Sequence, residues 1–266
     1  MNAINASAQL DRARLLRYAA LCAIATNILF NFLSITLFSH PSVEEVIHSY
    51  PTLFSPAGYS FCIWIVHILF IGYALIQIAP ERNYKPAFDR LAIPLIITNV
   101  FELGWQYAFV QGQLGIGMLF LIGMLISACA LYVCAQKHFE QFNLGTWWRI
   151  PFNLYLAWTS IIVISASSSW LVSIGWVVEG ITETDWMIVM IFVTGFLGSL
   201  MAFGRQDSVY PLVMSWSCLS LGMKYSQVSS NISIAALAVG LFLIWCALVA
   251  AVQSPKVAEK VFDNPI

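Results

Sequence analysis

Residues 114–135 read LGIGMLFLIGMLISACALYVCA, a run in which every side chain is uncharged. A helix needs about 20 such residues to cross the roughly 30 Å hydrocarbon core of a bilayer. Backbone groups find no hydrogen-bond partner in lipid, and a helix satisfies them within a single segment. The run therefore predicts a membrane-spanning helix.

The same pattern recurs along the whole chain. Of its 266 residues, 60% are hydrophobic and 9% are charged, whereas soluble domains carry about 25% charged residues. We therefore predict an all-α fold, a polytopic transmembrane helical bundle of about eight helices. The seventh is short and contains Pro211, so a broken or re-entrant segment is the alternative there. The expected spans are 14–38, 57–79, 89–110, 114–135, 148–172, 184–204, 208–225 and 230–252.

Lysine and arginine residues predict the orientation of these spans, because short cytoplasmic connections retain them. With eight spans, only Lys224 of the 12 basic residues falls on the side opposite the N-terminus. We therefore expect an integral protein of the plasma (inner) membrane with both termini in the cytoplasm. The lipid bilayer is its expected partner, and nucleic acid is not, because a net charge of −1 provides no basic surface.

Two ionisable side chains fall well inside expected spans, His67 in the second and Glu102 in the third. An acidic residue there costs about 2.5–3.5 kcal/mol on insertion scales, and such residues normally face the bundle interior or a cavity. Asn99, Glu102 and Gln106 are spaced by three and four residues, so they share one helix face. This face predicts a wet cavity, and hydrogen bonding that only ties the helix to a neighbour is the alternative.

Polar side chains form stripes on two more helices. Asn27 and Asn31 share a face of the first expected span, and Tyr155 and Trp158 share a face of the fifth. Such stripes indicate either hydrogen bonds between helices or a common cavity.

Small residues predict close packing instead. Gly123 with Ser127, and Gly198 with Ala202, have the four-residue spacing that lets helices approach each other. The 6 cysteines lie in apolar spans without CxxC spacing, which favours a packing role, and we expect no metal site.

Trp64, Trp105 and Trp158 lie deep in three different expected helices. Their rings could line a chamber for a flat apolar ligand, with plain bundle packing as the alternative. Further aromatic, proline and glycine residues accompany each tryptophan. Those of the second span are Pro56, Gly58, Tyr59, Phe61 and Gly72, and those of the third and fifth are Tyr107, Phe109, Pro151 and Tyr155.

With these motifs, residues 14–172 resemble the tryptophan-rich sensory protein family, also called the translocator protein or peripheral benzodiazepine receptor family. Two positions depart from the family pattern. Glu102 stands where the family usually has asparagine three residues before the tryptophan, and Ala166 stands where it has asparagine eight residues after the next one.

The resemblance implies a five-helix membrane module over residues 1–172, followed by an additional three-helix segment over 173–266. It also implies a pocket for tetrapyrroles, sterols or similar planar hydrophobic molecules, closed by the loop 39–55. Porphyrin or haem is the candidate ligand, and a homodimer is a further expectation. The ligand-binding residues it implies are Tyr59, Phe61, Trp64, His67, Asn99, Glu102, Trp105, Gln106, Phe109, Tyr155 and Trp158.

The leading hypothesis is a membrane sensor or carrier for a planar hydrophobic ligand. The alternative is a proton-coupled secondary transporter of a small molecule in which Glu102 and His67 change protonation. We do not expect an enzyme, because the sequence shows no nucleophile elbow, metal-ligand cluster or paired carboxylates, and we assign no catalytic residue. Lys224 could form a Schiff base with retinal, but a lysine that snorkels to the interface explains it better.

Overall fold

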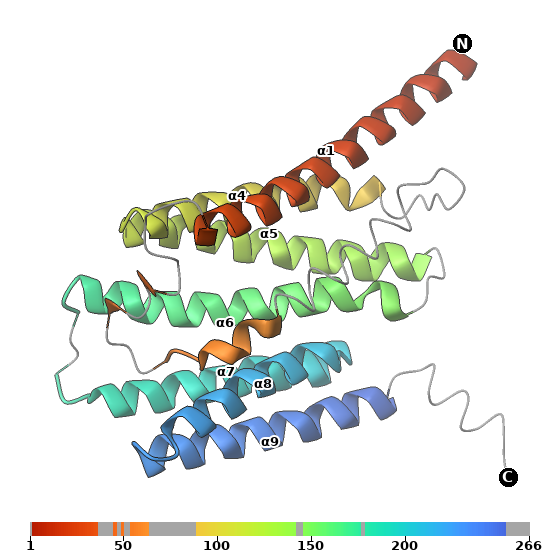
Figure 1. Ribbon diagram of the computed structural model, residues 1–266. Helices are drawn as coiled ribbons and strands as arrows, with labels where there is room; N and C mark the ends of the chain where they lie inside the picture. The colour runs from red at the N-terminus through yellow and green to blue at the C-terminus, as the bar shows by residue number, and fades with distance from the viewer. Residues whose placement is uncertain are drawn as a thin grey trace, which may run out of the picture. The chain divides into compact units, whose positions relative to one another are not determined.

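The computed structural model describes residues 2–36, 45–46, 49–50, 54–63, 89–141, 146–176 and 179–253. Within these ranges it contains seven α-helices and no strand (Figure 1). The helices are α1 (Asn2–Thr36), α4 (Ala92–Val110), α5 (Leu114–Gln141), α6 (Ile150–Ser173), α7 (Glu183–Arg205), α8 (Val209–Tyr225) and α9 (Ser230–Gln253). Two short 3-10 helices are η1 (Gly58–Cys62) and η4 (Thr146–Trp148).

The predicted all-α fold is confirmed. Each described helix corresponds to one expected span within three residues at most ends, but α1 begins twelve residues before residue 14 and α5 continues six residues beyond residue 135. Most of the expected second span, 57–79, lies outside the described residues. Among the described helices, α5, α6, α7 and α9 are long and apolar enough to cross a membrane.

The helix α8 is continuous from Val209 to Tyr225 despite Pro211. Pro211 is the third residue of the helix, where the backbone N–H has no partner within the helix, so a proline costs little. The side chain of Asp207 supports this start by accepting hydrogen bonds from the backbone nitrogens of Val209 (2.8 Å) and Tyr210 (3.2 Å).

The chain forms two compact units. The first consists of residues 1–49 and 67–152, and the second of residues 50–66 and 153–266. The first therefore contains α1, α4, α5 and the start of α6, and the second contains η1, the rest of α6, α7, α8 and α9. The modules 1–172 and 173–266 that the resemblance implies stay a prediction.

In the first unit α4 and α5 form a helical hairpin (Figure 1). The turn between them places Gly112 at a φ of +72°, a conformation in which a side chain would be strained. Glycines let the two helices approach each other. A Cβ atom on Gly123 would lie 2.4 Å from the Phe101 ring, and one on Gly117 would lie 2.2 Å from the Phe109 ring. The predicted packing role of Gly123 agrees with this contact.

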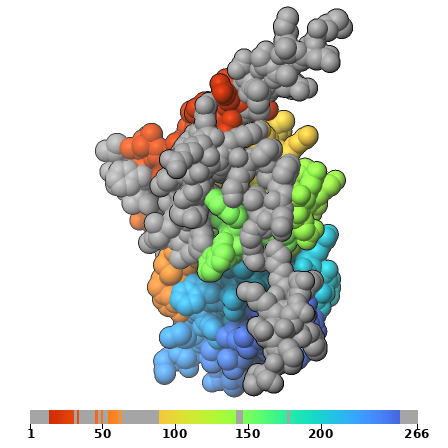
Figure 2. Space-filling model, turned by 90° about the vertical axis from the view of Figure 1, so that its right-hand side faces the viewer, coloured from red at the N-terminus to blue at the C-terminus, as the bar shows by residue number. Residues whose placement is uncertain are grey.

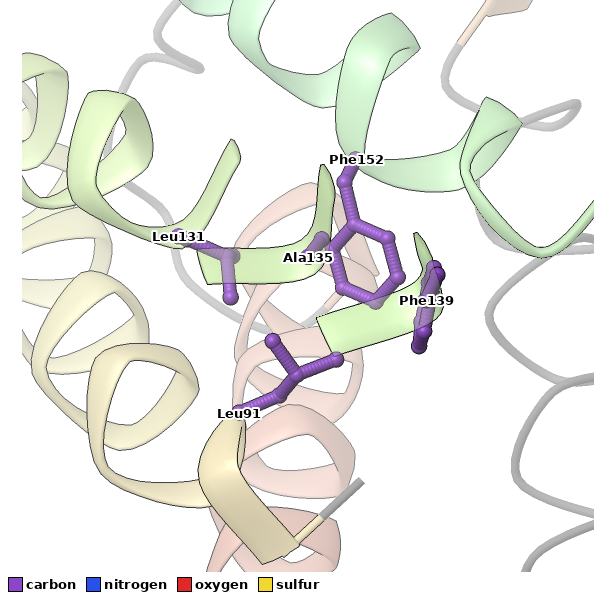
Figure 3. Packing of buried hydrophobic residues seen from close by; sticks show 5 residues of the cluster. All are labelled: Leu91, Leu131, Ala135, Phe139 and Phe152. Carbon is purple, nitrogen blue, oxygen red and sulfur yellow. The ribbon is translucent and has the colours of Figure 1, made fainter. Parts of the chain in front are cut away.

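At one end of the hairpin, five residues form a hydrophobic cluster (Figure 3). The Phe139 and Phe152 rings lie 5.7 Å apart and tilted, so the start of α6 packs on the end of α5. Close by in the sequence, Arg149 donates a hydrogen bond to Gln136 (3.1 Å) and forms an ion pair with Glu140. The clustered residues are Leu91, Leu131, Ala135, Phe139 and Phe152.

In the second unit α9 packs against both α7 and α8. A Cβ atom on Gly198 of α7 would lie 2.5 Å from Leu243 of α9, in line with the predicted close packing at Gly198. Between α8 and α9, Ser215 Oγ donates to the backbone oxygen of Gly240 at 2.7 Å. Figure 2 shows α8 and α9, in blue, in contact along their surface.

Candidate functional site

The polar face predicted on α4 lies inside the first unit. Asn99, Glu102 and Gln106 are 7%, 2% and 3% exposed, although their helix is otherwise apolar. Spacings of three and four residues place the three side chains on the side of α4 that packs on α1. Buried polar groups are costly unless they are hydrogen-bonded, so each of these groups needs a partner.

An amide of α1 completes this face. Gln106 Nε2 lies 3.5 Å from Asn27 Oδ1, and Asn27 Nδ2 donates to Asn99 Oδ1 at 3.1 Å. Asn99 Nδ2 then donates to the backbone oxygen of Leu95 at 2.8 Å. We call Asn27, Asn99, Glu102 and Gln106 the α1–α4 polar network.

Glu102 is the acidic residue of this network. Gln106 Nε2 lies 3.5 Å from Glu102 Oε1, the same distance that separates it from Asn27, so one N–H₂ group serves both acceptors. A carboxyl group this deeply buried carries up to four acceptor positions when it is ionised, and a proton when it is not. It can therefore anchor a hydrogen-bond donor or exchange a proton.

Aromatic side chains adjoin the network on the same helix. Trp105 is 3% exposed and Phe109 is fully buried, and their ring centroids lie 5.5 Å apart with the planes tilted by 54°. Gly117 leaves the space that the Phe109 ring occupies. The indole Nε1 of Trp105 is buried and has no hydrogen-bond acceptor among the described residues.

Of the predicted site residues, the structure thus brings together Asn99, Glu102, Trp105, Gln106 and Phe109. Tyr59, Tyr155 and Trp158 belong to the second unit. There Tyr155 and Trp158 are buried in α6, whereas Tyr59 is 49% exposed. That all of these residues line one chamber stays a prediction.

Other predicted residues lie outside the described part of the chain. These are the side chain of Phe61, together with Trp64 and His67, and most of the loop 39–55.

The residues 54–60, which lead into the expected second span, dock on α8 in the second unit. Lys224 Nζ donates to the backbone oxygen of Ser55 at 2.7 Å, and Trp216 Nε1 donates to that of Ser60 at 3.2 Å. Between these two contacts, the backbone nitrogen of Ala57 donates to Ser220 Oγ. Lys224 is therefore hydrogen-bonded to this segment, and its snorkelling to the membrane interface stays a prediction. Figure 2 shows the orange residues of this segment beside the blue of α8.

Sequence reasoning missed two parts of this arrangement. Asn27 was predicted to lie on a polar stripe but not among the ligand-binding residues. The available signal was that Asn27, like Asn99, lies on a polar face of its helix. The docking of residues 54–60 on α8 had no local signal, because its partners are separated by more than 150 residues.

The described residues contain no group of three or more His, Cys, Asp or Glu side chains that could hold a metal ion. In comparison with known proteins, the sequence model of a family described as TSPO-like protein matches residues 17–249. The match extends beyond residues 14–172 and includes α7, α8 and most of α9. Neither the search of curated proteins nor that of solved structures gives a match.

Proposed function

The chain belongs to the TSPO-like protein family, and from this premise we propose that it is a membrane sensor or carrier that binds a planar hydrophobic molecule. The observation that carries the proposal is the face of α4, on which buried Glu102 and Gln106 adjoin the Trp105 and Phe109 rings. A flat ligand would stack on the aromatic rings and direct its polar edge to the network. Ligand sites commonly combine an apolar wall with a few placed polar groups in this way.

We propose that a porphyrin such as haem is a suitable ligand. A homodimer and the absence of catalytic activity belong to the same proposal.

Quenching of tryptophan fluorescence tests the proposal. Purified full-length protein is titrated with protoporphyrin IX, beside the variants Trp105→Phe and Glu102→Ala. Saturable quenching that requires about tenfold more ligand in both variants is expected, since each loses one contact of roughly 1–2 kcal/mol. Trp147→Phe is the control, because this substitution also removes one indole ring and Trp147 is 74% exposed in η4. Quenching that never saturates, and is equal in all four proteins, would exclude a porphyrin site.

A second candidate function rests on the hydrogen bonds of the network. Gln106, Asn27 and Asn99 connect α1 to α4 next to the buried acid Glu102. In a proton-coupled secondary transporter, protonation of Glu102 would change these bonds and so the contact between the helices. His67 would be the second titrating group.

Transport and binding differ in one measurable respect. In proteoliposomes with a fluorescent porphyrin, a transporter takes up ligand faster when a pH gradient is imposed, and Glu102→Gln removes this acceleration. A protein that only binds shows the same uptake with and without the gradient. Uptake that depends on the gradient equally in both proteins would exclude Glu102 as the coupling group.

A further inference from the structure

Two positive charges without a partner lie at one end of the α4–α5 hairpin, beside the hydrophobic cluster of Figure 3. Arg90 lies just before α4 and Lys137 lies near the end of α5, and both side chains are exposed. Neither side chain forms a hydrogen bond or an ion pair within the described part of the chain. We call these two residues the basic pair.

Cys134 places both members of the basic pair at the junction of the two helices. Its thiol donates to the backbone oxygen of Arg90 at 3.4 Å, which joins the start of α4 to the last turns of α5. Lys137 lies three residues after Cys134, a spacing that puts the two side chains about 5–6 Å apart where they leave the helix. The charges of Arg90 and Lys137 both act on the sulfur atom. An anion at this junction therefore experiences both charges.

The nearest acidic residues do not neutralise the basic pair. Asp89 forms an ion pair with Arg17 at 3.1 Å, and Glu140 forms one with Arg149 at 3.5 Å. Each of these acids thus balances an arginine outside the basic pair. Basic residues are expected on the cytoplasmic side of any membrane protein, but here two of them retain their full attraction for an anion.

An apolar stripe leads away from Lys137 along α5. Val133, Ile126 and Leu119 precede it by 4, 11 and 18 residues, so all four side chains share one face of the helix. The three apolar side chains are 48%, 66% and 71% exposed. From Leu119 to Val133 the stripe covers about 20 Å of helix, whereas one leaflet of the hydrocarbon core is about 15 Å thick. A hydrocarbon chain matches this stripe, and a soluble anion does not.

We infer that the basic pair binds the phosphate of an anionic phospholipid, one of whose acyl chains lies along Val133, Ile126 and Leu119. A zwitterionic lipid carries the same phosphate but adds a positive group, which the basic pair repels. The predicted topology places this end of the hairpin in the cytoplasmic leaflet, whose surface is negative. The site is separate from the proposed ligand face of α4 and does not depend on that function.

Native mass spectrometry of the full-length protein in an uncharged detergent measures the affinity for single lipid molecules. Dioleoyl phosphatidylglycerol carries one negative charge, and dioleoyl phosphatidylcholine has the same chains and no net charge. We expect the first phosphatidylglycerol molecule to bind about twentyfold more tightly than phosphatidylcholine. Each of the two basic residues is expected to contribute about fivefold to this ratio.

Variants assign the preference to the basic pair. Arg90→Gln and Lys137→Gln should each weaken the binding of phosphatidylglycerol about fivefold and leave that of phosphatidylcholine unchanged. Lys137→Arg keeps the charge and should bind as the wild type does. Arg205→Gln is the matched control, because Arg205 is exposed at the end of α7 and belongs to the same side of the membrane in the predicted topology. This control should keep the wild-type affinity for both lipids.

Two results would overturn the inference. Equal affinity of the wild-type protein for the two lipids would exclude an anion site, whether or not a variant folds. A loss in Arg205→Gln as large as the loss in Arg90→Gln and Lys137→Gln would mean general attraction by positive charge and no site at the hairpin.

Glycerophosphoglycerol, the headgroup without its acyl chains, separates a lipid from a soluble phosphate ester. A large excess of this compound should leave phosphatidylglycerol bound, because it lacks the chain that contacts α5. Displacement of the lipid by this compound would overturn the assignment to a phospholipid. The titration with protoporphyrin IX tests the planar-ligand function separately from all of these outcomes.

Discussion

At the scale of single residues, glycines set the distance between α4 and α5 and thereby the place of the Phe109 ring. A Cβ atom on Gly117 would lie 2.2 Å from Phe109 Cδ2, closer than side chains tolerate. We expect Gly117→Ala to displace this ring and to destabilise the protein by about 1–3 kcal/mol, as overpacked cores do. Because Phe109 packs on Trp105, the affinity for protoporphyrin IX should fall as well.

The thermal unfolding midpoint, followed by far-UV circular dichroism in detergent, measures this effect. Gly204→Ala is the matched control, because a Cβ atom on Gly204 in α7 would meet nothing within 4 Å. Alanine is the better helix former by about 1 kcal/mol, so this variant should be as stable as the wild type or more so. Equal midpoints for the two variants would contradict the packing described for Phe109.

At the scale of elements, the side-chain bond from Asn27 to Asn99 joins α1 to α4. A double-mutant cycle with Asn27→Ala and Asn99→Ala should give a coupling energy of about 0.5–1.5 kcal/mol, the range found for polar contacts between membrane helices. The free energy of unfolding in a denaturing detergent is the quantity measured. A cycle of Asn27→Ala with Ser199→Ala should give none, because Ser199 bonds to its own helix. If the cycle of Asn27→Ala with Asn99→Ala also gave no coupling energy, the network would not hold the two helices together.

These contacts also show what the sequence could predict at this scale. Helix positions follow from runs of apolar residues, which are local, so α4 through α9 agree with the expected spans. The faces of α1 and α4 could be predicted from spacing, but the choice of Asn27 as the partner of Asn99 depends on how two helices pack. The docking of Ser55 on Lys224 joins residues that are 169 positions apart, and no local sequence pattern predicts such a contact.

The segment 54–60 runs along α8 in the opposite direction, since Ser55 pairs with Lys224 and Ser60 with Trp216. We expect Lys224→Met, which keeps the length of the side chain, to speed hydrogen exchange of the backbone amides in this segment roughly tenfold by removing a charged hydrogen bond. Exchange in α9 should not change. Lys137→Met in α5 provides the control, and a segment that exchanges equally slowly in both variants would argue against Lys224 as its anchor.

At the scale of the whole molecule, the distribution of lysine and arginine predicts both termini in the cytoplasm, with Lys224 on the other side of the membrane. The two ends of α8 test this topology and the seventh span together, because Arg205 precedes that helix and Val228 follows it. In a background without native cysteines, Arg205→Cys and Val228→Cys each carry one exposed thiol. We expect a membrane-impermeant maleimide added to intact cells to label only the cysteine at position 228, and to label both after the membrane is opened. Labelling of position 205 alone would reverse the orientation, whereas labelling of both in intact cells would mean that α8 enters the membrane and returns on the same side.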